Sequence, residues 1–129
     1  MKVAISSQGK RRDSQVELWF GRAAYYLIVD TGSMTFDALE NEAAGDSADI
    51  DEINAARLVI NAGAQAVLTG NCGLDARHMF AIAGVKLFQG VPGTVEEVVA
   101  QLKDGKLIEV SAPGIRQPVE AGAAEDWKS

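Results

Sequence analysis

The chain has 129 residues, of which 47% are hydrophobic and 23% charged, a composition typical of one soluble globular domain. Its formal net charge of −6 argues against a general nucleic-acid-binding protein, because phosphate binding needs a strongly basic surface. No apolar run reaches the ~20 residues of a membrane span, and the N-terminal segment lacks the apolar region of a signal peptide. The lone Cys72 excludes a disulfide within the chain, so we expect a cytoplasmic protein that does not bind membranes.

The N-terminal third predicts strands joined by polar loops. Residues 3–5 read as a short buried strand, and a polar loop over 6–14 with three consecutive cations follows it. Residues 25–30, YYLIVD, form the strongest predicted strand because they are rich in aromatic and β-branched side chains. The short connection over 31–33 predicts an antiparallel hairpin with a strand over 34–39.

The rest of the chain alternates helices with short apolar strands. Apolar residues at helical spacing predict helices over 50–62, 74–83 and 95–103, and apolar runs predict strands at 66–68 and 85–88. Thr94 and Glu97 have the spacing of a capping box at the start of the last helix. Residues 107–110 read either as a short edge strand or as an extension packed on the domain.

This order of elements predicts an α/β fold: a ribonuclease-H-like mixed five-stranded sheet flanked by helices. We expect one domain over residues 1–110 and a poorly ordered C-terminal tail over 111–129. The unit over 66–93 reads as strand, glycine loop, helix, strand and glycine loop. A right-handed crossover places both glycine loops at the carboxyl edge of the parallel strands, where α/β proteins bind ligands.

The first glycine loop, TGNCG over 69–73, predicts an anion site. It lacks the lysine and hydroxyl residue of a P-loop, but a glycine turn that leads into a helix presents N–H groups and a positive dipole end. Cys72 in this loop is either a buried core residue or a thiol whose pKa the helix lowers. His78 is six residues away and gives Cys72 no evident base, and no carboxylates converge as a ribonuclease-H-like nuclease requires.

One cysteine and one histidine cannot complete a conventional iron–sulfur or structural zinc site. A metal cluster bound here would bring most of its own ligands, such as sulfide, and would be held as an anion. Backbone amides would hold it together with arginines, and a soft contact could come from a sulfur atom; the candidates are Arg11, Arg12, Arg22, Arg77, Cys72 and Met79.

Several segments together resemble the nitrogenase iron–molybdenum cofactor accessory family, which includes NifX and the C-terminal domain of NifB. They are MKVAIS, FGRA over 20–23, YYLIVDT, GAQAVLTGNCG and GVKLFQGVPGTVEEVVAQLKDGKL over 84–107. The chain is also similar to the orange proteins of sulfate reducers, which carry a molybdenum–copper sulfide cluster without a covalent protein cage. Residues 41–49 and 74–75 depart from the pattern of many relatives.

The resemblance implies a non-catalytic carrier or scaffold for an anionic metal–sulfur cluster of molybdenum–copper or iron–molybdenum type. It implies protein partners for cluster delivery, and we expect a monomer or weak homodimer. The alternative is a small-molecule or nucleotide-binding regulatory module that uses the same loops; a thiol-dependent enzyme ranks third. The predicted cofactor-binding residues are Ser6, Arg11, Arg12, Phe20, Gly21, Arg22, Thr69, Gly70, Asn71, Gly73, Gln89 and Gly90, and the candidate metal ligands are Cys72 and His78.

Overall fold

A computed structural model describes residues 1–41 and 48–110, with only the backbone described at 48–51. The predicted tail over 111–129 and most of the acidic segment 42–49 lie outside the described residues. No helix in the described ranges has the length and apolarity needed to span a membrane. The strands are β1 (Lys2–Ser7), β2 (Tyr25–Asp30), β3 (Thr35–Glu40), β4 (Ala66–Leu68) and β5 (Lys86–Phe88), and the helices are the short 3-10 helix η1 (Phe20–Arg22), α1 (Ala48–Asn61), α2 (Leu74–Ala83) and α3 (Val95–Lys103).

The sheet is mixed and has the strand order β3-β2-β1-β4-β5, which confirms the predicted five-stranded α/β fold. β1 and β2 pair antiparallel, as do β2 and β3, whereas β4 is parallel to β1 on one side and to β5 on the other. Each parallel connection runs through a helix, because parallel neighbours cannot be joined by a tight turn.

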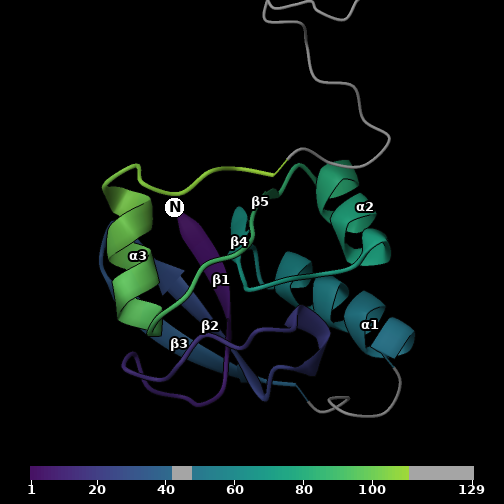
Figure 1. The fold of residues 1–129 in the computed structure, drawn as a ribbon, viewed down its shortest axis with the longest axis horizontal. Helices are drawn as coiled ribbons and strands as arrows, with labels where there is room; N and C mark the ends of the chain where they lie inside the picture. The colour runs from purple at the N-terminus through teal and green to yellow at the C-terminus, as the bar shows by residue number, and fades with distance from the viewer. Residues whose placement is uncertain (42–47, 111–129) are drawn as a thin grey trace, which may run out of the picture.

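Two apolar layers enclose the sheet, with α1 and α2 on one face and α3 on the other (Figure 1). Alternate residues of the strands face opposite layers, as the period of two in a β-strand requires. Ala4 and Val67 pack toward α1 and α2, whereas Val3, Ile5 and Leu68 pack toward α3. The central strands are therefore buried on both faces, which explains why they read as continuous apolar runs.

Most predicted boundaries lie within one or two residues of those in the structure. Thr94 and Glu97 form the predicted capping box at the start of α3. β3 starts at Thr35, one residue later than predicted, because Met34 has the left-handed φ of 59° in the turn. Residues 107–110 contribute one antiparallel bridge, between Glu109 and Phe88, so this segment lies along the outer edge of β5.

The strand directions place several loops at one edge of the sheet. β1, β3, β4 and β5 all run the same way, so the segments 8–24, 69–73 and 89–94, together with Asn41, follow strands that end at the carboxyl edge. The segments 69–73 and 89–94 lead directly into α2 and α3, and Glu52 near the start of α1 accepts from Gly73, so all three helices begin at this edge. The edge therefore gathers helix N-termini and glycine loops from distant parts of the sequence.

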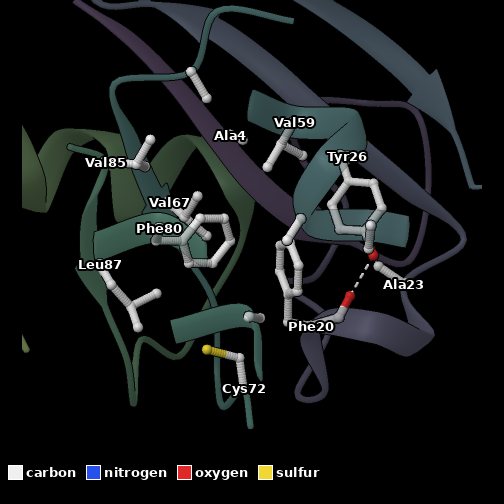
Figure 2. Close-up of a cluster of buried hydrophobic side chains, with 14 of the residues drawn as sticks. Ala4, Phe20, Ala23, Tyr26, Val59, Val67, Cys72, Phe80, Val85 and Leu87 are labelled. Atoms are coloured by element: carbon white, nitrogen blue, oxygen red, sulfur yellow. Dashed lines mark hydrogen bonds between the residues drawn. The ribbon is translucent and has the colours of Figure 1, made fainter. Parts of the chain in front are cut away.

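Asn41 is a buried polar residue that fixes η1 to the end of the sheet. Its side-chain nitrogen donates to the carbonyl oxygens of Ala23 at 2.9 Å and Gly21 at 3.3 Å and lies 3.3 Å from the Tyr26 hydroxyl. The Tyr26 hydroxyl donates in turn to the Phe20 carbonyl (Figure 2). Asn41 therefore satisfies several backbone acceptors that are removed from water.

We predict that Asn41→Ala lowers the free energy of unfolding by about 1–3 kcal/mol, because buried carbonyl oxygens lose their donor. Chemical denaturation followed by circular dichroism measures this loss. Asn54→Ala is the control: Asn54 is exposed on α1, and the change should stay within about 0.5 kcal/mol. Equal stability of the two variants would contradict this role of Asn41.

Candidate functional site

The loop between β4 and α2 starts at Thr69, whose buried hydroxyl pairs with that of Ser6 in β1. The Thr69 and Ser6 side-chain oxygens lie 2.7 Å apart, and the Ser6 hydroxyl also donates to the Glu17 carbonyl at 2.9 Å. Both residues are fully buried. These two predicted site residues therefore tie the ends of β1 and β4 together beneath the surface, where they do not face solvent.

The middle of the loop is covered on one side by residues 18–20. A Cβ atom at Gly70 would lie 2.5 Å from the Leu18 carbonyl oxygen, so this close approach requires glycine. The Phe20 amide donates to the Asn71 carbonyl at 2.9 Å, and the Gly90 amide donates to the Gly70 carbonyl at 2.7 Å. The structure thus brings the first glycine loop, the second glycine loop and the FGRA segment together.

Two side-chain oxygens from outside the loop accept hydrogen bonds from its next two N–H groups. The Cys72 amide donates to Gln89 Oε1 at 2.7 Å, and the Gly73 amide donates to a carboxylate oxygen of Glu52 on α1. A Cβ atom at Gly73 would lie 2.6 Å from the other Glu52 oxygen, and one at Gly21 would lie 3.1 Å from the Glu52 backbone. Glu52 therefore fits between two glycines and offsets the positive end of α2.

The Cys72 side chain is 6% exposed and lies at one end of the apolar cluster against α1 and α2 (Figure 2). Burial, and secondly the negative charge of Glu52, raise the pKa of the Cys72 thiol to about 12, although Arg77 opposes this effect. The interpretation in which the helix N-terminus lowers this pKa is therefore wrong. Desolvation and a nearby carboxylate both disfavour the thiolate form of Cys72.

Phe20 and Gly21 belong to the same packed region. The Phe20 ring lies 5.0 Å from the Tyr26 ring and 5.4 Å from the Phe80 ring, measured between centroids, and its side chain is buried. The FGRA segment therefore anchors η1 in the core, and of its first three residues only Arg22 is exposed.

Two of the predicted cations, Arg11 and Arg12, lie together in the loop after β1. Arg11 and Arg12 line a hollow of about 560 Å³ with Lys10, Asp13, Phe36 and Glu96. There Arg11 pairs with Asp13 at 2.9 Å and the hydrogen bond lowers the pKa of Asp13, while the Arg12 guanidinium lies 4.4 Å from the Phe36 ring centre. Phe36 packs with the α3 layer, whereas Cys72 packs with the α1 and α2 layer. These cations thus contact the opposite face of the sheet from Cys72.

Exposed apolar side chains surround the loop on its outer side. Leu18 is 58% exposed, Trp19 49% and Leu74 61%, and Trp19 forms a parallel bridge with the exposed Asn71. Gly90 at the neighbouring loop is exposed as well. A ligand that reaches this loop from solvent would therefore meet apolar side chains, the Asn71 amide, backbone and the Glu52 carboxylate at Gly73.

Among the side chains described, those of residues 1–41 and 52–110, no group of three His, Cys, Asp or Glu residues is arranged to hold a metal ion. His78 is exposed on α2, whereas Cys72 is buried at the turn before that helix. The structure thus gives the two candidate metal ligands different environments.

The sequence did not identify Glu52 as a residue of this region. Asp and Glu near the start of a helix normally stabilise their own helix. Glu52 instead accepts from the amide of Gly73, which lies 21 residues later and immediately precedes α2. No local spacing rule links these two positions.

Comparisons with known proteins give a consistent result. The family model for dinitrogenase iron-molybdenum cofactor matches residues 1–105. The apo form of the orange protein from Desulfovibrio gigas is similar with a TM-score of 0.82 and 30% identity, over 88% of this chain and 96% of that one. A candidate NifB protein from Thermotoga, of the DUF35 family, has a TM-score of 0.70 and 30% identity, over 88% of this chain and 98% of that one.

A candidate dinitrogenase from Methanocaldococcus jannaschii has a TM-score of 0.67 at 17% identity, over 88% of this chain and 97% of that one. At this identity the likeness shows a shared fold alone. Among curated proteins, none matches this sequence.

We predict that Cys72 reacts slowly with iodoacetamide in the folded protein. A rise of the pKa from 9.0 to about 12 lowers the thiolate fraction at pH 8 about a thousandfold, and the thiolate is the reacting species. The rate at pH 8 should be at least about a hundredfold lower than in urea, as measured by mass spectrometry. Similar rates in the two states would show that the thiol is accessible and ionises normally.

Proposed function

Because the chain belongs to the dinitrogenase iron–molybdenum cofactor family, we propose that it is a non-catalytic binding protein for an anionic metal–sulfur cluster. The family match over residues 1–105 is the observation that carries this proposal. The likeness to the apo form of an orange protein over 96% of that protein supports a carrier or scaffold role. The cargo we favour contains molybdenum, of the molybdenum–copper or iron–molybdenum sulfide type.

The side chains at the carboxyl edge are compatible with a cluster that brings its own sulfide ligands. The described residues offer no group of three metal-binding side chains, and the one thiol is buried and protonated. A sulfide-ligated cluster needs neither a set of metal-binding side chains nor a protein thiolate. The exposed rim formed by Leu18, Trp19, Asn71 and Leu74 would then hold it through apolar and backbone contacts, because exposed apolar patches mark binding surfaces.

Long-range attraction would come from the cations of the edge. Arg22 is exposed at the end of η1, and Arg11 and Arg12 lie in the loop after β1. In a protein of net charge −6, these side chains are where an anion gains most from a local positive field. We propose that delivery to a partner protein uses the same edge and that the carrier is a monomer or weak homodimer.

Anaerobic reconstitution with tetrathiomolybdate and copper(I) tests the function. We expect a visible charge-transfer band that stays with the protein during gel filtration. Cys72→Ser should still form the cluster, more weakly, because sulfide rather than protein thiolate completes the metal coordination. Absence of the band from both proteins would contradict cluster binding, and a colourless native isolate with bound nucleotide would favour a regulatory module instead.

Charge reversal tests the electrostatic part of the proposal. Arg22→Glu, and Arg11→Glu with Arg12→Glu together, should each weaken cluster binding at least about fivefold at low ionic strength. The loss should shrink above ~0.1 M salt, where charges more than ~10 Å apart are screened. Lys103→Glu is the control, because Lys103 ends α3 and lies at the opposite end of that helix from the carboxyl edge. Equal affinities in all these variants would contradict the electrostatic account.

A further inference from the structure

The loop before α2 is closed by side chains of this chain. Two successive amides, Cys72 N–H and Gly73 N–H, donate to oxygens of Gln89, which follows β5, and of Glu52 on α1. The Gln89 oxygen is neutral, whereas the Glu52 carboxylate carries a negative charge. An anion of the same chain thus occupies the position that an anionic ligand of this loop would take.

Glycines in two separate motifs make room for this carboxylate. Gly21 in the FGRA segment lies against the backbone of Glu52, and Gly73 in the TGNCG segment lies against its carboxylate. A Cβ atom at Gly21 would lie 3.1 Å from the Glu52 backbone, which is a tight contact, and one at Gly73 would lie 2.6 Å from a Glu52 carboxylate oxygen, which would have to move. Three distant segments of the chain are therefore shaped around one acidic residue, which indicates a specific contact rather than a solvent-facing helix acid.

We propose that Glu52 is an internal competitor for the cargo: its carboxylate holds Gly73 N–H in the apo protein, and the bound cluster displaces it. This inference rests on the proposed function. Glu52 is only partly buried, so its side chain can turn from the loop into solvent and be hydrated there. Gly73 N–H and the positive end of α2 then become available to the cargo.

Because Glu52 is covalently attached to α1, only some anions can displace its carboxylate from the Gly73 amide. A carboxylate attached to α1 competes at the effective concentration of an intramolecular group, in the millimolar range or above. Small monoanions that accept a hydrogen bond of similar strength cannot displace the Glu52 carboxylate at ordinary concentrations. A cluster that carries several negative charges and also contacts the exposed rim has additional binding free energy and can displace it. Glu52 therefore sets a threshold of charge and size that excludes common small anions.

Glu52→Gln tests the proposal, because glutamine keeps the shape and an oxygen that accepts from Gly73 N–H but removes the negative charge. Titration with tetrathiomolybdate and copper(I), followed by visible absorption, gives the affinity. We expect at least about tenfold tighter binding than in the wild type, on the scale of one charge-assisted hydrogen bond. The matched control is Asp37→Asn, since Asp37 is exposed on β3 and the substitution changes the net charge equally. It should change affinity less than about twofold.

Affinity in Glu52→Gln that is equal to or weaker than that of Asp37→Asn would overturn the inference and leave the proposed function intact. Failure of the wild type and all variants to form a cluster would refute the proposed function, and the inference with it. A second readout is the Gly73 amide in ¹H–¹⁵N spectra of the wild type. It should shift when the cluster binds, and an unchanged Gly73 signal in the loaded protein would show that Glu52 stays in place.

Discussion

The parallel pairing of β4 between β1 and β5 is the constraint on which the rest of this structure depends. It sets the loops after three strands side by side, so that residues near 6–20, 70 and 90 contact one another. It also buries these strands on both faces, because the helical connections must cross over the sheet. The apolar core and the glycine-rich edge are thus two consequences of one strand arrangement.

At that edge the polar groups are largely satisfied within the chain. Ser6 pairs with Thr69, Gln89 accepts from the Cys72 amide, Glu52 accepts from Gly73, and the capping box closes the start of α3. Buried donors without partners are costly, so an apo protein with this many loop amides needs such internal acceptors. A ligand that binds at this edge, as we propose, would therefore exchange hydrogen-bond partners with the chain rather than fill vacant donors.

The two faces of the sheet contribute different chemistry to this edge. The α1 and α2 face supplies the protonated Cys72 and the Glu52 carboxylate, and the exposed Leu18, Trp19 and Leu74 lie around the same loop. The α3 face supplies the cations near Phe36. For the sulfide-rich anion that we propose as cargo, this arrangement would separate long-range attraction from short-range contact and would leave the protein thiol outside the primary coordination.

The sequence by itself determined the elements and their order. The capping box at Thr94, the apolar periodicities and the strand YYLIVD are local signals, and a local signal is readable wherever the interacting residues are close in sequence. The resemblance to a known family came from short motifs, and the family match covers the same residues.

Only the tertiary structure decided the chemistry of Cys72, the position of Arg12 over Phe36, and the role of Glu52. These properties depend on burial and on groups that the fold brings together. The Glu52 carboxylate, for example, accepts a hydrogen bond from an amide 21 residues away in the sequence. From the sequence, Cys72 reads either as a buried core residue or as a thiol activated by the helix N-terminus. Packing against an apolar cluster and a neighbouring carboxylate decides against activation, because desolvation and Coulomb energy depend on distance in space and not along the chain.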